Sequence, residues 1–140
     1  MIQVSYVPKE YINTCWKEVE GYLKKATDYT KGRYEVHDLY LSICKYDYHL
    51  WIAFDKEEIK GAVVTNITQY PRKKYVCMAF CGGKELVKWK DQMLDLLRKW
   101  AKDNGCSGIE ATGRRGWAKS LQSQGHKSLW ESFELPLEKD

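Results

Sequence analysis

The chain has 140 residues, of which 44% are hydrophobic and 30% are charged, and its formal net charge is +4. This length suits one domain, residues 1–140, with its own core. The positive charge is small and scattered, which argues against a nucleic-acid partner. No apolar run is long enough to cross a membrane, and residues 1–12 lack the apolar core of a signal peptide. We therefore expect a cytoplasmic protein without a membrane partner.

The N-terminal third of the chain predicts a strand followed by two helices. Residues 2–7 form a short apolar stretch that ends at Pro8. From Lys9, apolar residues recur at steps of three and four as far as Ala26, which predicts an amphipathic helix. The same spacing recurs over residues 36–44 and predicts a second, shorter helix.

The middle of the chain predicts three strands and a long helix. The runs 49–54, 62–70 and 75–81 are rich in β-branched and aromatic residues and are separated by turn residues, as in an antiparallel meander. Apolar residues between Leu86 and Trp100 then line one face of a helix, which Asn104-Gly105 would end.

The C-terminal part predicts a strand over 107–113, a helix over 116–125 and a last strand over 128–137. Two strands joined by a helical crossover prefer a parallel arrangement. We therefore predict an α+β fold, with a mixed, mostly antiparallel sheet of about six strands and helices on both faces. Strands 75–81 and 107–113 would be its parallel pair.

The five cysteines are odd in number and follow no zinc-site spacing. Cys77 and Cys81 lie four residues apart in a predicted strand, which places both on one face rather than around a metal ion. Reduced thiols in a reducing compartment explain the cysteines better than disulfides do, and we expect no metal.

The stretch YVCMAFCGGKELVKW (75–89) leads from a strand through Gly82-Gly83 directly into a helix. Backbone N–H groups at the start of a helix often bind phosphate. A simple tight turn is an equally good explanation, because glycine relieves steric conflict at any sharp reversal.

This order of elements, with a helix beginning just after the fourth strand, resembles the GNAT superfamily of acyl-CoA-dependent N-acyltransferases. The resemblance covers nearly the whole chain and implies that the parallel strands splay apart, so that the pantetheine arm of acetyl-CoA pairs with the fourth strand. It also implies that the turn binds the cofactor, with Phe80, Cys81, Gly82, Gly83 and Lys84 as candidates. Arg114 and Arg115 are further candidates, because at the start of a helix they oppose its dipole unless an anion or a carboxylate lies nearby.

The sequence departs from the GNAT motifs at two places. The family's turn reads Arg or Gln, two residues, Gly, one residue, then Gly or Ala, whereas this chain has Gly82-Gly83-Lys84-Glu85. In the second motif, Leu121 or Gln122 stands where the family has a tyrosine that protonates the departing thiolate. Ser120 is the nearest hydroxyl, and a serine hydroxyl is a weak acid.

Glu110 is the acidic candidate for catalysis, because it is out of phase with Ile109 and Ala111 on the fifth predicted strand and can face the cleft. An ion pair with Arg114 or Arg115, or simple exposure, explains it as well.

Residues 109–126 and the turn at 81–83 are also similar to small GNAT-like proteins of tailed phages. Two hypotheses follow. The chain is an N-acetyltransferase that uses acetyl-CoA and an amine acceptor on a protein or small molecule. Alternatively, it is a catalytically degenerate phage protein that binds a virion or host protein, in which case its own side chains should fill the cofactor cleft.

Overall fold

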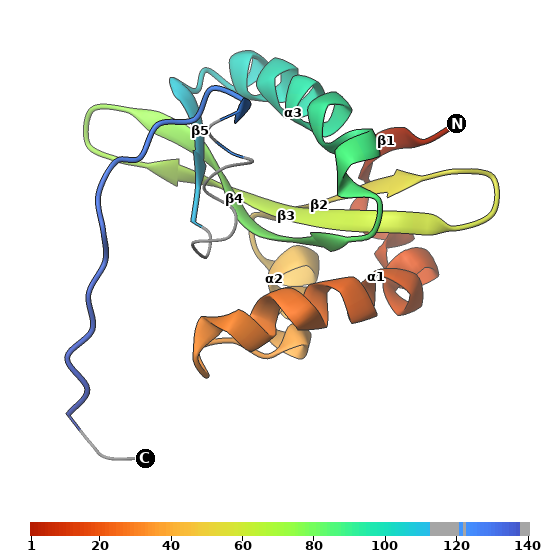
Figure 1. Ribbon diagram of the computed structural model, residues 1–140, viewed down its shortest axis with the longest axis horizontal. Coiled ribbons are helices and arrows are strands. Elements are labelled where there is room, and N and C mark those ends of the chain that lie inside the picture. Colours follow the sequence, from red (N-terminus) through yellow and green to blue (C-terminus); the bar gives the residue numbers. More distant parts are fainter. Residues whose placement is uncertain (113–120, 122, 138–140) are drawn as a thin grey trace.

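The computed structural model of the chain describes residues 1–112, 121 and 123–137. Its centre is one five-stranded sheet in the order β1-β2-β3-β4-β5 (Figure 1). Neighbouring strands are antiparallel except for β4 and β5, which are parallel, as the sequence predicted. The strands are β1 (Gln3–Val7), β2 (Tyr48–Phe54), β3 (Ile59–Gln69), β4 (Lys74–Gly83) and β5 (Gly108–Ala111).

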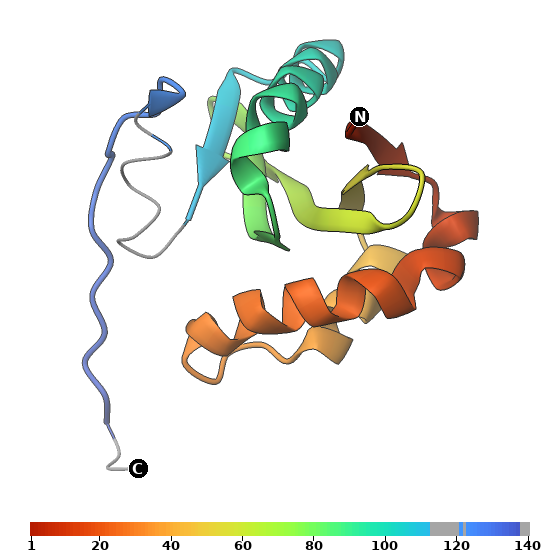
Figure 2. The ribbon, with the colours of Figure 1, turned by 45° about the vertical axis from the view of Figure 1, so that its right-hand side comes forward.

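Helices cover both faces of this sheet, which confirms the predicted fold class. The helices α1 (Ile12–Thr27) and α2 (Val36–Lys45) lie on one face, and α3 (Leu86–Asp103) lies on the other (Figures 1 and 2). Two 3₁₀ turns, η1 (Lys9–Tyr11) and η2 (Asp28–Thr30), flank α1. Among the described residues, no helix combines the length and the apolar character that a membrane span requires.

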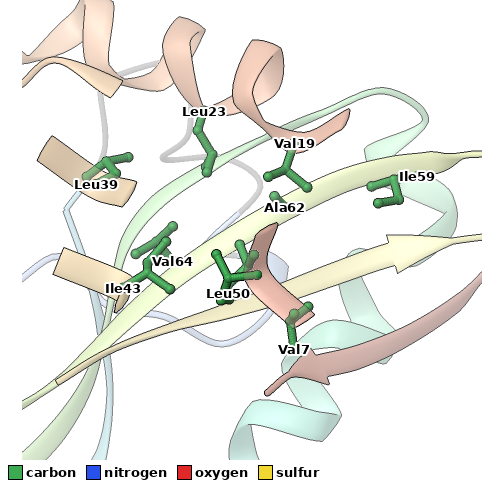
Figure 3. Close-up of a cluster of buried hydrophobic side chains, with 10 residues drawn as sticks. Val7, Val19, Leu23, Leu39, Ile43, Leu50, Ile59, Ala62 and Val64 are labelled. Atoms are coloured by element: carbon green, nitrogen blue, oxygen red, sulfur yellow. The ribbon is translucent and has the colours of Figure 1, made fainter. Parts of the chain in front are cut away.

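The layer between the sheet and the helices α1 and α2 is a continuous apolar core. Figure 3 shows Val19 and Leu23 of α1 pointing toward Ala62 and Val64 of β3. These side chains come from the periodic apolar positions of the helix and from one face of the strand, so their burial follows from the two spacings in the sequence. The other labelled members of the cluster are Val7, Leu39, Ile43, Leu50 and Ile59.

A second core, rich in aromatic residues, lies between the sheet and α3. Trp51 and Trp89 are almost completely buried there, together with Met93 and Leu97. The indole Nε1 of Trp51 donates to Oγ1 of buried Thr65 at 2.8 Å, so this polar atom is satisfied inside the core.

The parallel pair is short, and β4 continues well beyond it. β5 pairs with β4 only from Tyr75 to Met78, and in the described part of the chain residues 79–83 of β4 have no partner on that side. The register with β3 shifts after Val64, so Ala79 is an additional residue of β4, a β-bulge. A bulge bends a strand and increases its twist, which directs β4 away from β5. The two strands therefore diverge as expected, starting at Ala79.

The C-terminal segment differs from the prediction. Residues 128–137 form no strand, and the described part of the chain has five strands in place of about six. This segment instead extends away from the sheet (Figures 1 and 2), and its residues are exposed. The predicted helix over 116–125 lies mostly outside the described residues, although Leu121 and Ser123 are helical.

Candidate active site

A cavity of about 1030 Å³ opens where β4 and β5 diverge. Its walls include residues 77–84 of β4 and the following turn, Ala111 and Thr112 at the end of β5, and parts of α1 and α3. The volume is at the upper end of the range for small-molecule sites, roughly 300–1,000 Å³. The cavity therefore has room for a ligand beside residues 79–83 of β4, which have no described partner on the side of β5.

Four polar or ionisable side chains form a row across the sheet beside this cavity. The strand registers place Tyr48 opposite Asn66, Asn66 opposite Cys77, and Cys77 opposite Glu110. Directly opposite residues point to the same face, and Tyr48 packs against the core beneath α1 and α2. The row therefore faces those helices, and Tyr48, Asn66 and Cys77 all line the cavity.

The Tyr48 hydroxyl and the thiols of Cys77 and Cys81 in the cavity wall stay protonated at neutral pH. Burial raises the pKa of Tyr48, and nearby Tyr34 and Cys77 raise it further. Burial likewise raises the pKa of Cys77, with a second contribution from Glu110, and it raises the pKa of Cys81 to about 12. Neutral thiols are poor nucleophiles, so this wall offers proton donors rather than an acyl-accepting thiolate.

Glu110 occupies the outer end of the row. Its carboxylate accepts a hydrogen bond from the Tyr70 hydroxyl at 2.8 Å. Glu110 is half-buried and is not one of the described residues that line the cavity. Among the described residues, Tyr70 is therefore the hydrogen-bond partner of the Glu110 carboxylate. The neighbour of Glu110 in the row is Cys77, which belongs to the cavity wall.

Close packing explains the Gly82-Gly83 pair. Both residues belong to β4 and pair with Ala62 and Gly61 of β3. A Cβ atom on Gly82 would lie 2.3 Å from the carbonyl oxygen of Tyr22 in α1, and one on Gly83 would lie 2.6 Å from Cα of Gly61. The glycines allow α1 and β3 to approach the end of β4, and both still line the cavity.

The turn between β4 and α3 contains a network of ion pairs. Lys60 lies 2.8 Å from carboxylate oxygens of both Glu58 and Glu85, and Lys84 lies 2.8 Å from Glu58. Hydrogen bonds from Lys60 and Lys88 lower the pKa of Glu85 to about 2. The cations that would attract a phosphate group are therefore already paired with carboxylates of the chain.

The α3 helix itself begins with little capping. Its N-cap residue is Glu85, which has a left-handed backbone conformation (φ 56°) and makes no side-chain capping hydrogen bond. The backbone N–H of Lys84 donates to the carbonyl oxygen of Lys60 at 2.8 Å. The Lys84 amide is thus part of the contact with β3.

The structure brings five of the predicted cofactor residues to the cavity wall, namely Phe80, Cys81, Gly82, Gly83 and Lys84. Arg114, Arg115 and Ser120 lie outside the described residues. Sequence reasoning missed Tyr34, Tyr48 and Cys77 as cavity residues. The strand registers bring Tyr48 and Cys77 to the cavity, and Tyr34 comes from the connection between η2 and α2. In the described part of the chain, no group of His, Cys, Asp and Glu residues is arranged to hold a metal ion.

No protein-family model and no curated protein sequence matches the chain. Solved structures do match it over nearly its whole length. A protein from Pyrococcus furiosus with a proposed acetyltransferase activity superimposes with a TM-score of 0.74 at 15% identity, covering 98% of this chain and 100% of that one. A transcriptional regulator from Bacillus halodurans gives a TM-score of 0.69 at 18% identity, with coverages of 98% and 100%.

An aminoglycoside acetyltransferase from an uncultured soil metagenomic sample, solved with sisomicin, gives a TM-score of 0.69 at 6% identity, with coverages of 98% and 97%. At these identities the likeness concerns the fold, and the activities named here are those of the three similar proteins. The mixed sheet, the diverging parallel pair and these superpositions together show that the chain has the fold of the GNAT superfamily.

Proposed function

We propose that the protein is an N-acetyltransferase that binds acetyl-CoA between β4 and β5. The observation that carries this proposal is the main chain of residues 79–83, which among the described residues has no partner on the side of β5 and lines an open cavity of about 1030 Å³. Unpaired N–H and C=O groups of a strand are suited to pair with an extended ligand. The amide-containing pantetheine arm of CoA has that form, and the GNAT fold supports the same placement.

The charge of the cavity wall supports an anionic cofactor. Among the described lining residues, the charged side chains are all cationic, namely Lys25, Lys31, Arg33, Lys84 and Lys90. Lys84 and Arg33 form ion pairs with Glu58 and Glu134. With these two carboxylates included, the described groups stay net positive, which attracts phosphate groups and repels a polycation. We therefore do not propose an aminoglycoside, the substrate class of the metagenomic enzyme, as the acceptor for this chain. The acceptor that we propose is a single amine on an otherwise neutral or acidic small molecule or protein.

The proposed reaction is direct acyl transfer. The amine nitrogen attacks the thioester carbonyl carbon, a C–N bond forms, and the C–S bond breaks. Glu110 is our candidate for receiving the ammonium proton through water, and a phenol of the cavity wall, Tyr48, is our candidate for protonating the departing thiolate. The raised pKa of Tyr48 keeps this proton available at neutral pH. Ser120, Arg114 and Arg115 remain proposals from the sequence alone.

Isothermal titration with acetyl-CoA tests the cofactor proposal. We expect saturable binding with a dissociation constant below about 1 mM. Thr112 is exposed at the cavity wall, so Thr112→Trp should weaken binding about tenfold or more without changing the fold. Arg72→Trp, in the exposed turn between β3 and β4, is the matched control. Absence of binding up to millimolar acetyl-CoA by the folded protein would rule the proposal out.

The ion-pair network predicts that removing one carboxylate strengthens cofactor binding. Glu58→Gln would release Lys84 and leave Lys60 paired with Glu85, making the turn more positive. We expect the affinity for acetyl-CoA to rise about threefold at low salt, and the gain to shrink as salt screens the charges. Glu57→Gln, which removes an exposed carboxylate of the same hairpin, should leave the affinity unchanged. Equal effects of the two substitutions on the affinity would mean that the phosphates of acetyl-CoA do not bind near Lys84.

The second hypothesis, a catalytically degenerate phage protein that acts by binding a virion or host protein, led us to expect a cleft filled by the protein's own side chains. The open cavity argues for a ligand instead. A folded protein that binds neither acetyl-CoA nor CoA would restore this alternative. The phage resemblance itself stays a prediction.

A further inference from the structure

A second hollow lies between α1 and α2, and we call it the outer groove. Its volume is about 380 Å³, within the range of small-molecule sites, roughly 300–1,000 Å³. The two helices contact each other on one face of the sheet (Figure 1). No described residue lines both the outer groove and the cavity between β4 and β5. The described residues that line the outer groove are Asn13, Trp16, Lys17, Glu20, His37 and Tyr40.

Helical spacing brings these six residues together. Positions 13, 16, 17 and 20 follow one another at steps that place them on one face of α1, and positions 37 and 40 lie one turn apart on α2. Val19 and Leu23 belong to a different face of α1 and point toward β3 (Figure 3). The outer groove is therefore a surface feature, separate from the core between α1 and the sheet.

Three aromatic rings form the wall of the outer groove. The Trp16 and Tyr40 rings meet edge to face, with centroids 5.1 Å apart and planes at 61°. The His37 ring lies parallel to Tyr40 at 6.1 Å. Trp16 and Tyr40 are half-buried and pack against the core, which fixes their rings. The face of an aromatic ring carries partial negative charge and attracts groups with partial positive charge, such as the C–H groups of a sugar ring.

Hydrogen bonds hold two polar groups beside these rings. The indole Nε1 of Trp16 donates to Oε2 of Glu20 at 3.3 Å, and the Tyr40 hydroxyl donates to Oδ1 of Asn13. A carboxylate can accept further hydrogen bonds, and the amide nitrogen of an asparagine can donate two. The Lys17 ammonium adds another donor to the lining. The outer groove thus offers donors and acceptors around an aromatic wall.

The charges of the lining favour a neutral ligand. The formal charges of Lys17 and Glu20 cancel, and with His37 neutral the described lining has no net charge. A cation would meet Lys17, and an anion would meet Glu20. A purely apolar ligand would take these polar groups out of water without replacing their hydrogen bonds, which is costly. Hydroxyl groups both donate and accept, so a neutral ring that carries several of them matches the whole lining.

We propose that the outer groove binds a neutral sugar. One face of the sugar ring stacks on Trp16, and its hydroxyl groups form hydrogen bonds with Asn13 and Glu20. This proposal rests on the outer groove alone and does not depend on acetyl transfer or on the cavity between β4 and β5.

An NMR titration with the methyl glycosides of glucose, galactose, mannose and N-acetylglucosamine tests the proposal. For at least one glycoside we expect saturable shifts of the Trp16 indole N–H and of the amides of residues 13–20 and 36–41. The dissociation constant should be about 0.1–10 mM, since the groove is open to water. Absence of such shifts with all four glycosides up to about 50 mM would overturn the proposal. So would shifts confined to the cavity between β4 and β5, or tighter binding in the groove by arginine amide or adenosine.

Matched substitutions on α1 test the assigned contacts. Glu20 and Glu18 are both exposed, and only Glu20 is among the described residues that line the outer groove. Glu20→Ala should raise the dissociation constant of the glycoside about tenfold, and Glu18→Ala should change it by less than about twofold. Equal effects of the two substitutions would contradict the proposal.

Trp16→Leu tests the aromatic wall. It keeps an apolar side chain against the core but removes the stacking face, so we expect glycoside binding to weaken about tenfold or more. Thermal unfolding checks that the variant is folded. Unchanged glycoside binding by the folded variant would overturn the stacking on Trp16, and the glutamate pair decides the proposal if the variant does not fold.

Discussion

Replacing Gly82 with alanine is expected to lower the free energy of unfolding by about 3 kcal/mol, or to prevent folding altogether. The added Cβ would lie 2.3 Å from the carbonyl oxygen and 2.9 Å from the carbonyl carbon of Tyr22. These are backbone atoms in the interior of α1, so they cannot turn aside as a flexible side chain would. The whole helix would have to move away from β4 and disturb the core beneath it.

Urea unfolding monitored by tryptophan fluorescence measures this loss. Gly21→Ala is the control, because Gly21 lies in the middle of the same helix, is exposed, and has no atom within 4 Å of the added Cβ position. That change should stabilise the protein by about 0.5–1 kcal/mol through its better helix propensity. If Gly82→Ala were as stable as the original protein, the contact between α1 and β4 in the structure would be wrong.

The second large effect is expected for Tyr48→Phe, and it depends on the proposed function. Removing the hydroxyl takes away the proton donor that we assign to the departing thiolate. We expect kcat to fall about 100-fold while the KM for acetyl-CoA changes little, because general acid catalysis acts in the transition state. Phenylalanine keeps the ring that packs on the core beneath α1 and α2, so the fold should persist.

Steady-state kinetics measure kcat and the KM for acetyl-CoA separately. Titration with acetyl-CoA gives an independent measure of binding. Tyr6→Phe is the control, since Tyr6 contacts Trp51 on the opposite face of the sheet and is not among the described residues that line the cavity. An unchanged kcat for Tyr48→Phe together with normal cofactor binding would remove Tyr48 from the mechanism and leave the cofactor site intact.

The sequence predicted the five observed strands and the three long helices because each depends on local patterns. The apolar repeat from Leu86 to Trp100 is an example, and α3 contains it in full. The parallel pairing of β4 and β5 was also predictable, since the crossover rule depends only on the order of elements. The strand predicted over 128–137 is absent, because a local sequence pattern does not specify the sheet edge with which a segment would pair.

Less of the candidate site could be predicted. Phe80 to Lys84 line the cavity, as a strand-to-helix turn that can be read locally allows, and their role in binding a cofactor stays a prediction. Tyr48 and Cys77 are 29 positions apart in the sequence and meet only through the registers of three strands. The reason for Gly82-Gly83 was equally hidden, because it depends on Tyr22 and Gly61, which contact the pair from α1 and β3.

The bulge at Ala79 also interrupts the alternation of β4 side chains between the two faces of the sheet. Met78 packs in the layer beneath α3, but Phe80, two positions later, packs beneath α1 and α2. Because of this one inserted residue, the β4 side chains that follow it point to the opposite face of the sheet from the one that uninterrupted alternation would give them. Deleting Ala79 would therefore reverse the orientation of the side chains that follow it. Phe80 would turn toward α3 and Cys81 toward α1, and both the divergence of β4 from β5 and the cavity wall would be lost.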